Sequence, residues 1–292
     1  MPSVGKIRKV RQVFRNEPKN SFGRLVATCL LVLPFIALAP SAFASSPVRI
    51  SAGAHSDIAL DGRLHRPAGT ARAPAVILMH GCGGWQPPVL SALEDYSRFL
   101  SANGIVVLNL DSFGPRRNAG GRVCSSFRRL AAARDYRTKD AFAALRYLQA
   151  QPFVDPENVF LIGQSNGGSV ALIAAQAATE RRLAGNHAGF RGAVALYPWC
   201  GAAGSLQPTL ASPLLILGGG RDDWVPPHDC KKFTSRGASV DVKVYPDAAH
   251  SFDLRIPVQR YLGKLVGYNE PAALKARREI LNFIRKHSTR TF

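Results

Sequence analysis

The sequence has few of the features that mark fibrous, membrane-embedded or nucleic-acid-binding proteins. It contains no internal repeat and no low-complexity linker, and its 292 residues are enough for one large domain. The longest apolar run, Leu25 to Ala39, has 15 residues, which is short for a membrane-spanning helix. Acidic residues are scarce, with 19 Asp and Glu against 38 Lys and Arg, for a net charge of +19. These basic residues form no recognisable nucleic-acid-binding module, so we expect no nucleic-acid partner.

The first 44 residues have the pattern of a secretory signal peptide. Seven Lys and Arg and one acid precede the apolar run, and Ala42-Phe43-Ala44 follows it as a small-x-small cleavage site. We therefore expect an exported protein, periplasmic or secreted, whose mature chain begins near Ser45 and forms one domain to residue 292. Cys29 lies inside the apolar run rather than after it, which argues against a lipid anchor. Removal of the peptide lowers the net charge to +13, which suits solubility, weak attraction to anionic surfaces or an anionic substrate.

Cysteine is also scarce, and export changes how it is counted. Of five cysteines in the whole chain, four remain after cleavage: Cys82, Cys124, Cys200 and Cys230. An even number in an oxidising compartment predicts two disulfides, for which three connectivities are possible.

Strand and helix patterns alternate along the chain. After a loosely alternating, antiparallel start at 47–66, apolar runs of strand length and helical patterns follow one another. We expect strands at 74–79, 105–110, 159–162, 192–197, 213–217 and, at the sheet edge, 240–245, with helices at 90–102, 135–149 and 271–286. This order predicts an α/β fold with a mostly parallel central sheet and helices on both faces.

The stretch from 158 to 173 combines a strand, a glycine-flanked serine and a helix. The sequence Gly163-Gln-Ser-Asn-Gly167 stands between an apolar strand and an alanine-rich helical pattern, which is the arrangement of a nucleophile elbow. The glycines allow the strand and the helix to approach closely. The hydroxyl of Ser165 would then lie beside a helix N-terminus, where developing negative charge is favoured. The pattern predicts that Ser165 is a catalytic nucleophile rather than part of an ordinary tight turn.

A catalytic serine needs a general base, and the base needs a carboxylate that fixes its tautomer. In open α/β sheets such groups lie in loops after the carboxyl ends of the strands. His250 lies in such a loop, between the last strand and the last helix, and we predict that it is the base rather than a structural histidine. His228 opens an earlier helix and His287 lies in the last one. Asp222 and Asp223 follow the strand at 213–217, and both are candidates for the acid.

Acyl transfer also needs hydrogen-bond donors for the oxyanion of the tetrahedral intermediate. The main-chain N–H of Asn166, directly after the nucleophile, is the first candidate. We assign the second to Cys82 in the glycine-rich loop at 80–84, because the glycines allow the main chain to face the substrate. His80, which opens this loop, is predicted to brace it rather than to act as a base.

Over residues 47 to 287, the sequence resembles the dienelactone hydrolase family of α/β-hydrolases. The resemblance rests on five motifs: His80-Gly-Cys-Gly-Gly84, Asp111-Ser-Phe-Gly-Pro-Arg116, Gly163-Gln-Ser-Asn-Gly167, Asp222-Asp-Trp-Val-Pro226 and His250-Ser-Phe252. It implies a mostly parallel sheet of about eight strands and hydrolysis of a small-molecule ester or lactone, without a cofactor or a metal. The namesake enzymes use a cysteine nucleophile, so Ser165 favours a broader, carboxylesterase-like activity.

The resemblance also implies roles for residues around the site. The spacing Asp222-x-x-Val225-Pro226 resembles the Asp-x-x-Val-Pro of many α/β-hydrolases and favours Asp222 over Asp223 as the acid. Arg116 or Arg117 would hold a substrate carboxylate, with a solvated surface arginine as the alternative. The strand order of the family brings all four cysteines to one end of the sheet. This placement favours bonds between Cys82 and Cys124 and between Cys200 and Cys230.

Other side chains have both a functional and a structural interpretation. Trp85, Trp199 and Trp224 follow strand ends, where they would form an aromatic wall for an acyl or alcohol group, or pack under loops. Arg137 and Asp140 are expected to form a structural ion pair on a helix face. We expect the segments 111–134 and 254–270 to cover part of the cleft.

Together these residues predict an exported serine hydrolase that acts on carboxylic esters or lactones through Ser165, His250 and Asp222. Two other functions fit the same fold: a peptidase or amidase, and a secreted binding protein on an inactive hydrolase scaffold.

Overall fold

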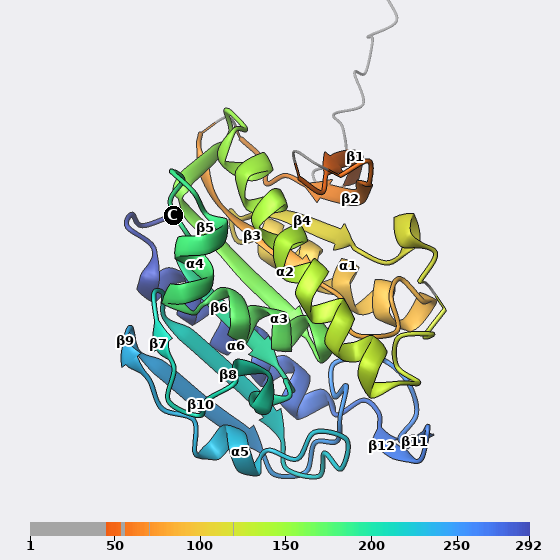
Figure 1. The fold of residues 1–292 in the computed structure, drawn as a ribbon. Coiled ribbons are helices and arrows are strands. Elements are labelled where there is room, and N and C mark those ends of the chain that lie inside the picture. The colour runs from red at the N-terminus through yellow and green to blue at the C-terminus, as the bar shows by residue number, and fades with distance from the viewer. Residues whose placement is uncertain (1–44, 54–55, 70, 119) are drawn as a thin grey trace, which may run out of the picture. The chain divides into compact units, whose positions relative to one another are not determined.

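A computed structural model describes residues 45–53, 56–69, 71–118 and 120–292 (Figure 1). An eight-stranded sheet runs through this part of the chain in the order β1-β2-β4-β3-β5-β6-β8-β10. The first two strands pair antiparallel, as does β2 with β4, and the strands from β4 to β10 are all parallel. This confirms the predicted mostly parallel sheet, with β10 at its edge. The strands are β1 (Ser45–Ser51), β2 (Ala59–His65), β3 (Ala73–Met79), β4 (Val106–Asp111), β5 (Val154–Gln164), β6 (Gly192–Leu196), β8 (Leu214–Gly219) and β10 (Val240–Tyr245).

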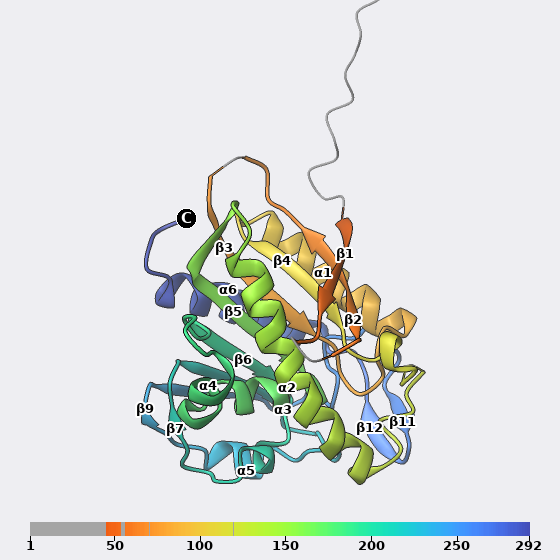
Figure 2. The same cartoon turned by 45° about the horizontal axis from the view of Figure 1, so that its top comes forward.

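Helices cover both faces of the sheet, as Figures 1 and 2 show. Alternate residues of β3 explain how: Ile77 belongs to the apolar core under α2 and α3, and Leu78 belongs to the core under α1 and α6. Buried strands of this kind are apolar on both sides, which is why they read as continuous hydrophobic runs. The helices are α1 (Pro87–Ser101), α2 (Phe127–Gln149), α3 (Asn166–Ala174), α4 (Ala177–Leu183), α5 (His228–Lys231) and α6 (Glu270–His287), with 3₁₀ turns η1 (Gly114–Arg116) and η2 (Cys200–Ala203).

Helix α2 is longer than the sequence predicted. We expected it from residue 135, but it begins at Phe127, where the side chain of Ser126 accepts a hydrogen bond from the main-chain N–H of Arg129. Its first turns are basic and largely exposed, so they lack the apolar periodicity from which the helix was identified. The segment 111–134, which we expected to cover part of the cleft as a loop, therefore ends in the first two turns of α2.

Two small sheets were not predicted. Strands β7 (Thr209–Leu210) and β9 (Arg236–Gly237) pair beside the main sheet. Strands β11 (Gln259–Tyr261) and β12 (Lys264–Val266) form a hairpin inside the segment that we expected to cover the cleft. A bridge between His250 and Val266 ties this hairpin to the loop after β10.

The predicted signal peptide, residues 1–44, lies outside the described residues. Within the described ranges, no helix combines the length and the apolar character needed to cross a bilayer.

Candidate active site

Ser165 stands at the turn between β5 and α3 in a strained main-chain conformation. Its φ of 51° and ψ of −113° lie where residues other than glycine are rare. A Cβ on Gly163 would lie 2.0 Å from the carbonyl oxygen of Gly167, and a Cβ on Gly167 would lie 2.5 Å from that of Met79. Both flanking glycines are therefore required by close packing of the turn. This is the geometry of a nucleophile elbow.

Ser165, His250 and Asp222 form a continuous hydrogen-bonded chain. The Nε2 atom of His250 lies 3.0 Å from the Oγ of Ser165, and its Nδ1 lies 2.6 Å from the Oδ2 of Asp222. A carboxylate only accepts, so Nδ1 carries a hydrogen and Nε2 is free to accept the proton of the serine. The other oxygen of Asp222 accepts from the main-chain N–H groups of Trp224 and Val225, which fixes the carboxylate. Both His250 and Asp222 are buried.

The neighbouring carboxylate, Asp223, points away from His250. Its Oδ1 accepts from the main-chain N–H of Leu265 and its Oδ2 accepts from Arg260, both on the β11–β12 hairpin. The hydrogen bond from Leu265, followed by that from Arg260, lowers the pKa of the Asp223 carboxyl. Of the two adjacent acids, Asp222 contacts the imidazole and Asp223 anchors the hairpin.

The loop after β3 passes alongside Ser165. A Cβ on Gly81 would lie 3.3 Å from the Cβ of Ser165. The carbonyl oxygen of Gly81 accepts from Nδ1 of His80 at 2.7 Å. In a planar trans peptide the next N–H, that of Cys82, points in the opposite direction, away from His80. The N–H of Asn166 is the first of α3 and has no partner within that helix. The two candidate oxyanion donors therefore flank the serine.

His80 is enclosed in the interior below this loop. Burial, and next to it the positive charge of Arg137, lower the pKa of its imidazole. Its Nε2 faces the N–H of Ser112 at 3.4 Å. These contacts agree with the expected role as a brace for the loop.

Two disulfides pair the four cysteines of the described chain. Cys82 is bonded to Cys124, and Cys200 is bonded to Cys230. These are the pairings that the resemblance favoured. The first bond joins the loop after β3 to the segment after β4, and the second joins η2 to α5.

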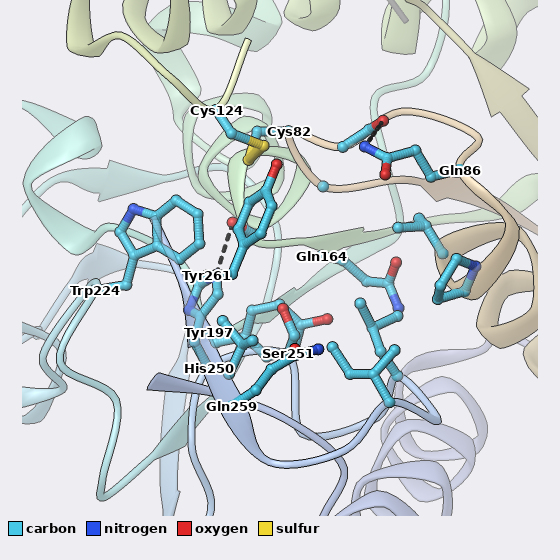
Figure 3. Close-up of a pocket in the computed structure, with 18 residues that line it drawn as sticks. Cys82, Gln86, Cys124, Gln164, Tyr197, Trp224, His250, Ser251, Gln259 and Tyr261 are labelled. Atoms are coloured by element: carbon cyan, nitrogen blue, oxygen red, sulfur yellow. Dashed lines mark hydrogen bonds between the residues drawn. A yellow bond between two sulfur atoms is a disulfide. The ribbon is translucent and has the colours of Figure 1, made fainter. Parts of the chain in front are cut away.

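Ser165 opens onto two cavities. The larger has a volume of about 210 Å³ and mostly apolar walls, to which Gln164, Tyr197, Leu254 and Tyr261 contribute (Figure 3). The hairpin thus covers part of the site, as we expected for the segment 254–270. The smaller cavity, about 160 Å³, adjoins Ser165 on the side of α2 and α3 and is lined by Arg134, Ser169 and Trp199, among others.

The tryptophans divide between the two interpretations offered for them. Trp224 lines both cavities, and its ring lies 5.1 Å from that of His250 and 5.9 Å from that of Tyr261 (Figure 3). Trp199 lines the smaller cavity. Trp85 lines neither cavity and packs against the guanidinium of Arg63, which agrees with the structural interpretation rather than with a substrate contact.

The expected pair of Arg137 and Asp140 is wrong. Arg116 forms two hydrogen bonds with the carboxylate of Asp140 and stacks on Tyr136, and it lines neither cavity. Asp140 is therefore not the partner of Arg137. Instead, Arg137 is buried and contacts His80 and Asn166. The sequence singled out neither this contact nor the cavity residues Gln164, Tyr197, Tyr261 and Arg134. Arg117 is exposed and, like Arg116, lines neither cavity, which agrees with the alternative of a surface arginine.

Comparison with known proteins identifies the family of the chain. A sequence profile for the family described as "Dienelactone hydrolase family" matches residues 60–288. The chain belongs to this family. A curated relative, the probable 2-oxo-3-(5-oxofuran-2-ylidene)propanoate lactonase of a Bradyrhizobium species, is 27% identical over 197 residues, covering 65% of this chain and 77% of the relative.

Solved structures show the same dienelactone hydrolase fold. A promiscuous phosphotriesterase of this type from metagenomic libraries superimposes with a TM-score of 0.64 at 21% identity, covering 84% of this chain and 98% of its own. Dienelactone hydrolase from Anabaena variabilis superimposes with a TM-score of 0.58 at 21% identity, covering 85% and 99%. The predicted fold and family are thereby confirmed.

Removal of either disulfide is predicted to lower the stability of the protein by a similar amount, but only one of them is predicted to affect its activity. They close segments of 42 and 30 residues, so loss of either should cost about 4 kcal/mol, or about 10 °C in Tm. Only the first joins the loop beside Ser165. We expect the Cys82→Ala/Cys124→Ala variant to lose about tenfold or more in kcat for ester hydrolysis, and Cys200→Ala/Cys230→Ala to keep its kcat. Thermal melts and steady-state kinetics of both variants test this, and equal kcat values would refute a role for the first bond.

Proposed function

We propose that this protein is an exported serine hydrolase that cleaves carboxylic esters or lactones through Ser165, His250 and Asp222. The observation that carries the proposal is the continuous hydrogen-bonded chain from Asp222 through His250 to the strained Ser165, at the wall of a mostly apolar cavity. Nucleophile, base and acid each come from a different strand end, and no single structural requirement would bring them together.

In the first half of the reaction, Oγ of Ser165 attacks the carbonyl carbon and its proton passes to Nε2 of His250. The carbonyl oxygen becomes an oxyanion, which the N–H groups of Cys82 and Asn166 stabilise. Asp222 stabilises the imidazolium by its hydrogen bond to Nδ1. When the intermediate collapses, the bond to the alcohol oxygen breaks and that oxygen takes the proton from His250. In a lactone, the released alcohol stays attached to the acyl group.

In the second half, water attacks the acyl-enzyme. His250 takes a proton from the water and returns it to Oγ of Ser165 as the acid leaves. The same two N–H groups stabilise the second oxyanion. This scheme uses groups of this chain, the substrate and one water molecule.

The cavities indicate the size of the substrate. About 210 Å³ with mostly apolar walls suits a small acyl or ring group. A lactone is favoured by the curated relative, whose described activity is that of a lactonase. The smaller cavity would take the other half of an ester, on the opposite side of Ser165.

Export and the single domain from residue 45 to 292 form part of the proposal. The signal-peptide pattern supports export. The two disulfides are consistent with an oxidising compartment, since such bonds are rare in most cytosolic proteins.

Active-site labelling of the exported protein tests both parts. The full chain is expressed, protein is recovered from the periplasm and medium, and its intact mass is measured. The expected mass corresponds to a chain beginning near Ser45.

The recovered protein is then treated with a fluorophosphonate, and the labelled residue is mapped by mass spectrometry. Hydrolysis of p-nitrophenyl esters, lactones and matched anilides is assayed in parallel. We expect label on Ser165 and hydrolysis of esters or lactones. Hydrolysis of anilides alone would indicate an amidase, and absence of label on folded protein would indicate a binding protein.

A further inference from the structure

Arg137 is a positive charge buried in the interior of the protein. Its side chain has no exposed surface, and no carboxylate in the described ranges forms an ion pair with it. The neighbouring Asp140 is occupied by Arg116. Burial lowers the pKa of Arg137 to about 10, so the guanidinium remains protonated at neutral pH. The ring of Phe113, 4.8 Å from the guanidinium carbon, and the more distant charges of Asp111 and Asp140 offset only part of the cost of burying this charge without an ion pair, so its hydrogen-bond partners need an explanation.

The guanidinium joins two segments that flank Ser165. Its Nη1 donates to the side-chain oxygen of Asn166 at 2.7 Å, and its Nη2 donates to the carbonyl oxygen of His80 at 2.5 Å. The side-chain Nδ2 of Asn166 in turn donates to the main-chain carbonyl oxygen of Leu130, which also lies on α2. Asn166 opens α3, and His80 opens the loop that carries Cys82. Arg137 is thus a cross-link between the two segments that hold the candidate oxyanion donors.

We propose that Arg137 is a positioning residue of the ester-hydrolysis reaction, which holds the two oxyanion donors at a fixed separation and places a positive charge behind them. This inference rests on the function proposed above. It assigns to a helix residue, remote from the substrate, a role in stabilising the transition state.

Geometry explains why an arginine is suited to this task. The guanidinium is planar and directs its N–H groups along fixed lines, so two acceptors that bind it are held at one distance. With the carbonyl of His80 held by Arg137 and the carbonyl of Gly81 held by His80, two successive peptide planes of the loop are fixed. Fixed donors cost no reorganisation when the oxyanion forms, which is the condition for a large effect on rate.

The position of Arg137 separates effects on binding from effects on catalysis. It lines neither cavity, so it has no contact with a bound substrate. Loss of its contacts should therefore weaken stabilisation of the oxyanion and leave ground-state binding nearly unchanged. A purely structural role predicts a different result, in which Tm falls and kcat per folded molecule does not.

The test compares three variants with a control from the same helix. Arg137→Met removes both hydrogen bonds and the charge, and Arg137→Lys keeps the charge but cannot bridge both acceptors. Asn166→Ala breaks the cross-link from the other side and keeps the main-chain N–H. Arg146→Met is the control, because Arg146 also lies on α2 and donates to a main-chain carbonyl, that of Leu183, away from the site.

We expect Arg137→Met to lower kcat about 100-fold with KM within about threefold, by analogy with loss of an oxyanion donor. The inhibition constant of a trifluoromethyl ketone, which forms an oxyanion on Ser165, should rise by a similar factor. Arg137→Lys should show the same pattern at about tenfold. Asn166→Ala should lower kcat by a similar factor, and its KM is left out of the comparison because Asn166 lines the smaller cavity. Arg146→Met should match the wild type in kcat.

The outcomes distinguish this inference from the function on which it rests. If the wild type hydrolyses no ester or lactone, the proposed function is wrong. If the wild type is active and the variants keep its kcat and its inhibitor affinity at a lower Tm, Arg137 is structural only and the inference is overturned. If Arg137→Met does not fold, Arg137→Lys and Asn166→Ala decide by the same two measurements.

Discussion

Replacement of Ser165 by Ala is expected to lower kcat/KM for ester hydrolysis by about 10⁵-fold or more. The Oγ of Ser165 forms the bond to the acyl group, and the methyl group of alanine cannot act as a nucleophile in its place. His250→Ala should have an effect of similar size, since the serine then has no base 3.0 Å from its Oγ. The double variant should be hardly worse than either single one, because the two residues act as a unit. Steady-state and single-turnover kinetics on the best ester of the panel measure all three.

A matched serine separates catalysis from folding. Ser97 is also buried, but its hydroxyl donates to the carbonyl oxygen of Leu93 within α1, away from both cavities. Ser97→Ala should keep its kcat and react with the fluorophosphonate like the wild type. If Ser165→Ala hydrolyses esters at the wild-type rate, the nucleophile has been misassigned and another residue of the cavity must take its place.

The second large effect is expected at the acid. Asp222→Asn should lower kcat about 10⁴-fold, because an amide can donate to Nδ1 of His250 and so favour the wrong tautomer for accepting the serine proton. The side-chain oxygen of the asparagine can still accept from the main-chain N–H groups of Trp224 and Val225, so the turn should remain intact. The measurement is kcat on an activated ester, with circular dichroism to confirm that the variant folds.

Asp223→Asn provides a matched control for Asp222→Asn, since the two acids are adjacent. It weakens the contacts with Arg260 and Leu265 on the hairpin and leaves the hydrogen bond from His250 to Asp222 in place. We expect a change of less than tenfold in kcat and in KM, because the hairpin lines the larger cavity and is bound to the residue next to Asp222. A larger loss of kcat in Asp223→Asn than in Asp222→Asn would reverse the assignment of the acid.

Much of the fold and the central residues of the site could be predicted from the sequence because their signals are local. The elbow combines a strand, two obligatory glycines and a helix within a few residues. The parallel strands are apolar on both sides and so form continuous runs. The candidate acid and histidine could then be located because they lie in loops that leave the carboxyl ends of strands. These features depend on spacing along the chain, which a sequence shows directly.

What could not be predicted depends on contacts between distant segments. Arg137 and Asp140 are three apart on a helix, a spacing that usually indicates a pair. However, Asp140 binds Arg116, 24 residues earlier, and Arg137 binds Asn166 and His80, 29 and 57 residues away. No local rule distinguishes these choices.

The first turns of α2 and the β11–β12 hairpin were missed for a different reason. Both are short or polar segments whose formation is decided by what they pack against. The start of α2 is marked by the cap at Ser126, but the residues that follow are basic and exposed. The hairpin is three residues on each side and is held largely by Asp223 and by the bridge to His250.

The attachment of this hairpin would couple entry of a substrate and release of a product to the loop that carries Asp222. Tyr261 forms part of the cavity wall, and hydrogen bonds from Arg260, Lys264 and Leu265 all end on Asp223. Displacement of the hairpin to admit a substrate or release a product would break bonds to the residue that directly follows Asp222. Entry, chemistry and release are then not independent steps. Substitutions on an exposed hairpin, remote from the serine in sequence, would alter turnover and affinity together.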